Sequence, residues 1–324
     1  MRSIQTTSAF PLSSVKPLDG LMAYRSFCLA TTRKALERSR TRRTTSPVDG
    51  VTPLELLGDI DGIPYARCPS SGSIFLAELP SPSEWADVLR QVSQYRHSPK
   101  TFHADLAQSR TDHVYAPKLE WIQDALRLQG LHQPKVLEVV TSPSDFTALL
   151  QDSGLCSEVV SIEETDVAHR HVRDEHPGQA DVAVLLESLD RIDDPFTLLR
   201  GLIERVKPGG LLFATGLVAS GFDMATLGLR NRYLYPPDRA NCFSLQGLSV
   251  LLKKAGCSLL EVSTPGVLDV EIVSTHLHHD PSLQLSQFER SVVEADEETR
   301  KAFQTFLQQQ GLSSFARIVA RIPS

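Results

Sequence analysis

The sequence predicts an α/β protein: a three-layer sandwich with a mostly parallel sheet, preceded by a small N-terminal region rich in β-structure and helices. After Pro134, strand patterns alternate with helix patterns, which is typical of parallel strands joined by crossover helices. Before Pro134, short apolar segments are interrupted by glycines and prolines, which indicates a module with tight turns. These two observations divide the chain into regions at about residues 50 and 130.

Residues 1–50 are rich in arginine, serine and threonine and poor in acids, so we do not expect them to pack. They are interpreted either as a disordered extension or as a leader such as an organelle transit peptide. Residues 51–130 form the small module: strands between Leu54 and Leu79, then helices over 82–97 and 114–128. Residues 131–324 form the main domain.

In the main domain, predicted strands and helices alternate along the sequence. Asp194 and Pro195 are a helix N-cap and first position, Lys207 to Gly210 form a turn, and Gly311 ends the helix that Asp296 caps. That last helix is expected to bury Phe303, Phe306 and Leu307. The strands are expected at 136–140, 158–162, 181–186, 211–215, 257–262 and 315–322, and the helices at 145–152, 167–172, 195–206, 244–255 and 296–310.

Composition excludes several classes of function. The formal net charge of −6 gives no electrostatic attraction to nucleic acid, and no apolar run approaches the roughly 20 residues that cross a bilayer. The five cysteines show no paired spacing. Cys68 lacks a partner cysteine and the histidines at 276–279 are interpreted as a solvated loop, so no metal site is expected. We expect a cytoplasmic protein, or an organellar one if the leader is a transit peptide.

Four segments in the main domain resemble class I S-adenosylmethionine-dependent methyltransferases. Residues 136–150 (VLEVVTSPSDFTALL) are similar to the first strand, loop and helix of that Rossmann-like fold. Residues 187–195 (ESLDRIDDP) are similar to the stretch after the fourth strand, and residues 207–211 (KPGGL) to the turn before the fifth strand. Residues 235–256, which begin YPPDRANCFS, are similar to a segment of one bacterial branch.

The resemblance implies a set of site residues. The cofactor would be S-adenosylmethionine, and Glu163 at the end of the second strand would bind its ribose hydroxyls; a solvated carboxylate is the alternative interpretation of Glu163. Asp190 could equally be a helix cap or a surface charge. The full cofactor-binding set is Glu138, Val140, Ser142, Ser144, Glu163 and Glu187, and the catalytic set is Glu187, Asp190 and Arg239.

The chain departs from the family at several of these positions. The loop glycines of the family correspond to Val140, Ser142 and Ser144, and two histidine positions carry Arg191 and Arg239. Only 18 positions separate Glu163 from Asp181, which is short for a further helix, strand and helix.

Three functions are therefore compared. The first is methyl transfer to a small-molecule or metabolite acceptor held near Glu187, Asp190 and residues 230–241. The second is a catalytically inactive methyltransferase-like scaffold that binds a partner, which the lost glycines and histidines favour. The third, a nicotinamide-dependent oxidoreductase, requires a Gly-x-Gly-x-x-Gly turn that the sequence lacks.

Overall fold

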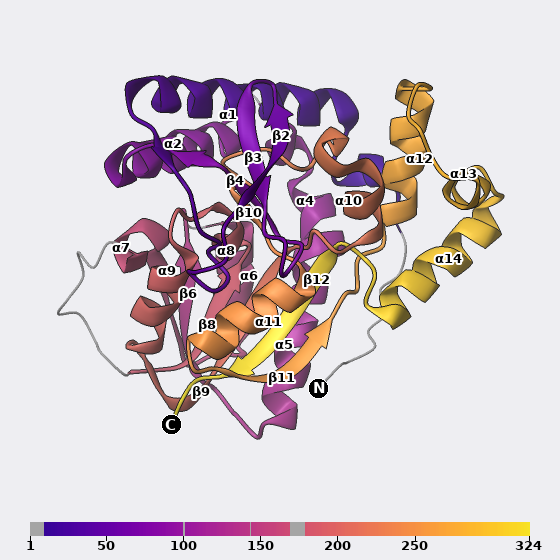
Figure 1. The fold of residues 1–324 in the computed structure, drawn as a ribbon. Coiled ribbons are helices and arrows are strands. Elements are labelled where there is room, and N and C mark those ends of the chain that lie inside the picture. Colours follow the sequence, from indigo (N-terminus) through magenta and orange to yellow (C-terminus); the bar gives the residue numbers. More distant parts are fainter. Residues whose placement is uncertain (1–9, 100, 143, 169–178) are drawn as a thin grey trace.

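The computed structural model describes residues 10–99, 101–142, 144–168 and 179–324. Two layers of helices surround a six-stranded sheet, and the N-terminal residues 10–99, which we call the cap, cover one edge of that sheet (Figure 1). The strands are β1 (Thr41–Arg42), β2 (Glu55–Ile60), β3 (Ile63–Arg67), β4 (Ile74–Leu76), β5 (Glu78–Leu79), β6 (Lys135–Val140), β7 (Glu158–Glu163), β8 (Ala180–Leu186), β9 (Val206–Leu217), β10 (Asn241–Cys242), β11 (Ser258–Ser263) and β12 (Phe315–Arg321).

The helices are α1 (Leu18–Arg38), α2 (Pro82–Arg96), α3 (Phe102–Asp105), α4 (Ala107–Arg110), α5 (Ala116–Leu128), α6 (Asp145–Asp152), α7 (Glu164–Ala168), α8 (Ser188–Arg191), α9 (Pro195–Ile203), α10 (Phe222–Leu227), α11 (Leu245–Lys254), α12 (Asp269–His279), α13 (Gln287–Val293) and α14 (Glu297–Gln310). Three short turns of other helix types are η1 (Leu12–Ser14), η2 (Thr111–Tyr115) and η3 (Gly228–Arg230). No helix among the described residues is both long and apolar enough to cross a bilayer.

The central sheet has the strand order β11-β12-β9-β8-β6-β7. Strands β7, β6, β8 and β9 are parallel, and β12 runs antiparallel between β9 and β11. The chain leaves β6 toward β7 on one side and later returns to β8 on the other, so the strand order reverses between β6 and β8. In open α/β sheets ligands bind at such a reversal, beyond the carboxyl ends of the strands.

Both faces of the sheet are covered because consecutive side chains on its central strands β6 and β8 are mostly apolar, and successive side chains point to opposite faces. On one face Val136, Val182 and Phe213 pack against Trp121 of α5 and Phe146 of α6. On the other face the apolar side chains of β6, β8, β9 and β12 join the main core, which also contains residues of α9 and α11. The expected three-layer α/β sandwich is thus confirmed, and its Rossmann-like sheet is mostly parallel.

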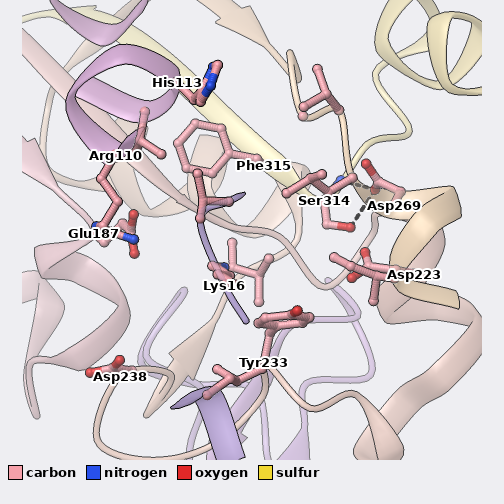
Figure 2. A pocket seen from close by; sticks show the side chains of 18 of the residues that line it. Lys16, Arg110, His113, Glu187, Asp223, Tyr233, Asp238, Asp269, Ser314 and Phe315 are labelled. Atoms are coloured by element: carbon pink, nitrogen blue, oxygen red, sulfur yellow. Dashed lines mark hydrogen bonds between the residues drawn. The ribbon is translucent and has the colours of Figure 1, made fainter. Parts of the chain in front are cut away.

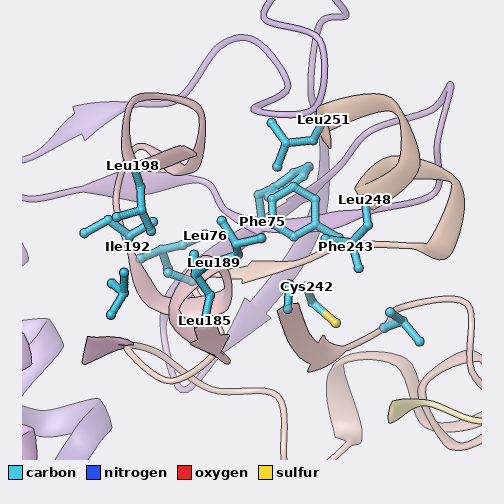
Figure 3. Close-up of a cluster of buried hydrophobic side chains, with 14 of the residues drawn as sticks. Phe75, Leu76, Leu185, Leu189, Ile192, Leu198, Cys242, Phe243, Leu248 and Leu251 are labelled. Carbon is cyan, nitrogen blue, oxygen red and sulfur yellow. The ribbon is translucent and has the colours of Figure 1, made fainter. Parts of the chain in front are cut away.

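A second part of the main core joins the small sheet to the main domain (Figure 3). Strand β10, from late in the chain, pairs with β4, so that the small sheet has the order β10-β4-β3-β2. The rings of Phe75 and Phe243 meet edge to face with centroids 5.4 Å apart. Leu185, Leu189 and Leu248 belong to the same buried cluster, so the N-terminal module shares its core with the large sheet.

The N-terminal fifty residues differ from the expectation. From Leu12 onward they are ordered, and α1 packs along α2 across the cap (Figure 1). Helix α1 buries Leu21, Tyr24, Cys28 and Leu29, among others. The expectation that this region does not pack is therefore wrong for residues 10–50, because apolar residues at helical spacing form one buried face despite the basic composition. Residues 1–9 lie outside the described residues, and the regional boundaries at 50 and 130 stay predictions.

Most elements of the main domain are confirmed within a few residues, with three differences. The segment Lys207 to Gly210 lies inside β9, and Gly209 has a φ of 76° there, which favours glycine. The histidines at 276–279 end helix α12 rather than forming a loop. Phe306 is 47% exposed, whereas Leu307 is buried as expected. Part of the helix expected over 167–172 lies outside the described residues.

Candidate functional site

The carboxyl ends of the parallel strands face the N-terminal cap and enclose a cavity of about 220 Å³. We call this cavity the charged pocket, because ionisable side chains from distant parts of the chain line it (Figure 2). These side chains include Lys16, Arg110, Lys118, Glu187, Asp223 and Arg239. The cavity is smaller than the roughly 300–1,000 Å³ of typical pockets for drug-sized ligands, so it suits a compact molecule.

Glu187 links the pocket to the strand reversal. It directly follows β8, has a left-handed backbone with φ 66°, and lines the pocket. Its carboxylate accepts a hydrogen bond from Arg239 Nη2 at 2.8 Å and lies 3.5 Å from Lys118 Nζ. Burial alone would raise the pKa of Glu187, but Arg239, Lys118 and Lys16 hold it well below its usual range. Glu187 is therefore an anion at neutral pH.

The three residues of the expected catalytic set lie together. Arg239 Nη1 is 3.4 Å from Asp190 Oδ2, so Arg239 contacts both carboxylates. Asp190 is 1% exposed and accepts a hydrogen bond from the backbone N–H of Leu217 at 2.9 Å. Burial raises the pKa of Asp190 to about 7. Asp190 does not line the pocket, so its contacts make it a positioning residue behind Arg239, and not the surface charge that was the alternative interpretation.

The rest of the expected cofactor set lies outside the pocket lining, on the β6 side of the strand reversal. Val140 ends β6, and Ser142 in the following loop hydrogen-bonds to Ser93 of α2 at 2.8 Å. The backbone N–H of Ser144 donates to Thr147 Oγ1 at 3.0 Å, which caps α6. Glu138 is buried within β6, which raises its pKa, and it accepts a hydrogen bond from Ser161.

At the end of β7, two neighbouring acidic residues have different surroundings. Glu163 ends β7 and is exposed. Glu164, which sequence reasoning did not select, is fully buried. Its carboxylate accepts hydrogen bonds from Thr141 Oγ1 at 2.8 Å and from Arg191 Nε at 3.1 Å. Arg191, at one of the two substituted histidine positions, thus ties α8 to the start of α7.

Sequence reasoning also missed the basic side of the pocket. Lys16 precedes α1, and its Nζ lies 4.3 Å from the centre of the Tyr233 ring. Lys118 of α5 has a side chain that is only 5% exposed. Burial lowers the pKa of Lys118 to about 8, although Glu187 opposes the decrease. Neither lysine belongs to a recognisable motif; only the fold brings them beside Glu187.

On the opposite side of the pocket stand Asp223 of α10 and Asp269 of α12 (Figure 2). Asp269 accepts hydrogen bonds from Ser314 N, Ser314 Oγ and Ser313 Oγ, each at 2.6 Å. Asp223 is fully buried and accepts a hydrogen bond from Asn231 Nδ2 at 2.9 Å. Burial and the nearby Asp269 raise the pKa of Asp223 to about 8. Its Oδ1 atom has no hydrogen-bond partner among the described residues.

The described residues contain no group of three or more histidines, cysteines or acids arranged to hold a metal ion. Cys68 instead lies 3.2 Å from the hydroxyl of Ser70.

Comparisons with solved structures return methyltransferases of low similarity. One is 1,6-didemethyltoxoflavin-N1-methyltransferase of Burkholderia thailandensis with bound 1,6-didemethyltoxoflavin and S-adenosylhomocysteine: identity is 13%, the TM-score is 0.45, and the match covers 83% of this chain and 100% of the other. Another is phosphoethanolamine N-methyltransferase 2 of Haemonchus contortus in complex with S-adenosylmethionine, with 14% identity, a TM-score of 0.39, and coverage of 63% and 53%. A third is an S-adenosylmethionine-dependent methyltransferase of Mesorhizobium loti, with 13% identity, a TM-score of 0.37, and coverage of 61% and 96%.

A search of curated proteins finds no match. A family model described as a methyltransferase domain matches residues 77–262, a stretch that includes β6 to β9, Glu187 and Arg239. Because this match spans more than half of the 324 residues, the chain belongs to the methyltransferase domain family.

Proposed function

We propose that this protein transfers a methyl group from S-adenosylmethionine to a compact small molecule bound in the charged pocket. The observation that carries the proposal is the position of Glu187. It belongs to the expected cofactor set, follows β8 at the strand reversal, and lines the pocket. Methyl transfer requires the cofactor and the acceptor to be in contact. Glu187 lies both at the strand reversal, where the cofactor is expected, and in the wall of the pocket, where the acceptor is proposed to bind.

The residues beside the strand reversal are compatible with the cofactor in their chemistry. S-adenosylmethionine supplies a methyl group on a positively charged sulfonium. Glu187 offers an ionised carboxylate, Ser142 and Ser144 offer hydroxyl groups at two positions where the family has glycines, and Thr141 offers a hydroxyl group between Val140 and Ser142. Hydroxyls can donate hydrogen bonds to carboxylate or ribose oxygens. In this proposal Glu138 and Val140 support the loop from β6, and Glu163 lies at the end of the neighbouring strand.

Alignment of the reacting atoms does most of the work in such a transfer, so the chain's main task is positioning. Arg239 contacts the Glu187 carboxylate on one side, and Lys118 contacts it on the other. The two contacts fix the carboxylate at the pocket wall. An acceptor that loses a proton on methylation also needs a base. Asp223, whose pKa is raised to about 8 and which has one oxygen atom unpartnered among the described residues, can act as that base only in its ionised form, which becomes abundant as the pH approaches 8.

Binding of S-adenosylhomocysteine to single-residue variants tests the cofactor residues. Glu163→Ala is expected to weaken binding about tenfold, through lost hydrogen bonds to ribose worth about 1 to 3 kcal/mol. Glu158→Ala, at the other end of β7, removes a surface carboxylate that pairs with Lys135 and serves as the matched control. Equal affinity of the Glu163→Ala variant and the wild type removes Glu163 from the site, whatever the wild-type affinity is.

The second candidate function is a catalytically inactive scaffold. A specific observation favours it: the hydroxyls of Thr141 and Ser142 already bond to Glu164 and Ser93. These bonds would have to break, or be shared, when a cofactor approaches the loop. Strand β7 is also the last strand on its side of the sheet among the described residues. A scaffold would bind neither S-adenosylmethionine nor its product.

A further inference from the structure

The lining of the charged pocket has more basic than acidic groups. Six lysine and arginine side chains line it, against four carboxylates. Two of the carboxylates already pair with two of the arginines: Asp238 with Arg96 at 2.7 Å, and Glu187 with Arg239 at 2.8 Å. The remaining carboxylates therefore decide whether the pocket as a whole is positive.

Both remaining carboxylates are accounted for within the protein. Asp269 accepts hydrogen bonds from both Ser313 and Ser314 and from Gln304. Asp223 is mostly protonated at neutral pH, because burial and Asp269 raise its pKa to about 8. Neither acid neutralises Lys16 or Arg110 through an ion pair among the described residues. Lys16 and Arg110 therefore leave an excess of positive charge in the pocket.

Lys16 and Arg110 are held by aromatic rings instead. Lys16 Nζ lies 4.3 Å from the centre of the Tyr233 ring, and the Arg110 guanidinium lies 5.6 Å from the centre of the Tyr115 ring. An aromatic face orients a cation without using up its N–H donors. Arg110 in addition donates one hydrogen bond, from Nη2 to the Tyr115 hydroxyl at 3.4 Å, and among the described residues its other N–H groups are left to a ligand. Figure 2 shows Lys16 in the middle of the pocket, with Arg110 and Glu187 together on one side of it.

We propose that the charged pocket binds a compact ligand with an anionic group, a carboxylate or a phosphate, which Lys16 and Arg110 receive together. The ligand is the methyl acceptor, and this identification rests on the proposed function; the anion site itself does not. The side chain of Lys118 is only 5% exposed. It adds positive charge to the same site, although the Glu187 carboxylate lies 3.5 Å from its Nζ atom. The pocket is also lined by the apolar side chains of Val15, Leu268 and Phe315, which can contact a small apolar part of the ligand.

Mutual repulsion among the cations supports the same conclusion. Burial is the main cause of the lowered pKa of both Lys16 and Lys118, and Arg110 lowers both further, so the three groups are close enough to repel one another. A bound anion would relieve that repulsion. Removing one of the charges without shortening its side chain should then leave the fold as stable as before, or more stable.

Calorimetric titration of the full chain with malonate and with inorganic phosphate, at low ionic strength, tests the site. The wild type is expected to bind at least one of the two probes. Lys16→Met and Arg110→Gln should weaken that binding by at least about tenfold. Lys16→Arg should restore most of it, and Lys253→Gln, which removes an exposed lysine on α11, should leave it unchanged. Thermal melting verifies that each variant is folded.

Two results overturn the proposal: failure of the wild type to bind either probe, and equal binding by the wild type and both charge-removing variants. Repeating the titration with saturating S-adenosylhomocysteine separates the two sources of an anion. Unchanged probe binding assigns the site to the acceptor, whereas competition assigns it to the carboxylate of the cofactor and overturns the acceptor claim. If S-adenosylhomocysteine does not bind at all, the proposed function fails while the anion site is still tested by the variants.

Discussion

Carboxyl groups near the pocket differ in their ionisation because their burial and their neighbours differ. Glu187 is surrounded by three basic side chains and stays ionised. Asp223 is fully buried, whereas Glu187 is only partly buried, and burial together with the nearby Asp269 lets Asp223 keep its proton up to about pH 8. Similar carboxyl groups thus become an anion on one wall and a neutral acid on the other.

This contrast predicts a pH-dependent stability for Asp223→Asn. In the unfolded chain an aspartate ionises near pH 4, whereas folded Asp223 ionises near pH 8. Its pKa is raised on folding, so its stabilising contribution is complete below about pH 4 and is lost as the pH rises through about 8. The free energy of unfolding of Asp223→Asn, relative to wild type, should increase over that window by an amount on the order of a few kcal/mol.

Urea unfolding at several pH values measures this difference. Asp87→Asn is the control, because Asp87 is a surface residue whose side chain is 56% exposed. A difference between Asp223→Asn and wild type that does not vary with pH would show that Asp223 is not protonated in the folded protein.

Gly216 offers a second test at the scale of single residues. A Cβ atom at position 216 would lie 2.6 Å from Asp190 Oδ1, which is closer than van der Waals contact allows. Gly216→Ala should therefore destabilise the fold by about 1 to 3 kcal/mol. In a double-mutant cycle with Asp190→Ala the two losses should be less than additive, since the overlapping atom is gone. Additive losses would place the cause elsewhere.

At the scale of elements, helix α1 most changes the picture obtained from the sequence. Its residues are basic on the outside, and composition alone suggested an unpacked extension. The apolar positions Leu21, Tyr24, Cys28 and Leu29 nevertheless have helical spacing, and they form its buried face. Periodicity was the more informative signal here, because a helix needs only one apolar face to pack.

Truncating a buried side chain of α1 should be costly. Leu29 is 4% exposed, and Leu29→Ala is expected to lower the free energy of unfolding by about 3 kcal/mol, mainly through the cavity left behind. Lys34→Ala changes an exposed position of the same helix and should alter stability by less than about 0.5 kcal/mol. Chemical denaturation compares the two; equal small losses would mean that α1 does not contribute to the core.

The elements of the main domain were predictable because each carries its own local pattern. Asp194, for example, caps α9 as expected, accepting hydrogen bonds from Phe196 N and Thr197 N. Pairings between distant segments carry no local signal. The pairing of β10 with β4, and the short helices around the pocket, arise only when the chain folds. Tertiary contacts, rather than propensity, determine those parts.

The same distinction separates the site residues. Glu187, Asp190 and Arg239 were selected because they belong to segments that resemble a family, and in the fold Arg239 lies within ion-pair distance of both acids. Lys16 and Lys118 come from segments without a motif, so their approach to Glu187 could not be inferred from spacing. Their burial is a property of the whole fold.

For the whole molecule, the arrangement is a methyltransferase-family sheet whose carboxyl edge is closed by its own N-terminal residues. The cap contributes Lys16, Tyr24 and Arg96 to the pocket, and the sheet contributes Glu187 and Phe315. The cap is therefore part of the ligand site. Any variant or binding study has to keep these N-terminal residues, since their removal would open the pocket and expose the core.

The central claim is that the strand reversal still admits the cofactor although its loop lacks glycines. Calorimetric titration of S-adenosylmethionine into the 324-residue chain tests it directly. We expect one site with micromolar affinity, which corresponds to a binding free energy of about −8 kcal/mol. No heat of binding at millimolar ligand, with the protein folded, would contradict the claim and make the scaffold the better explanation of this fold.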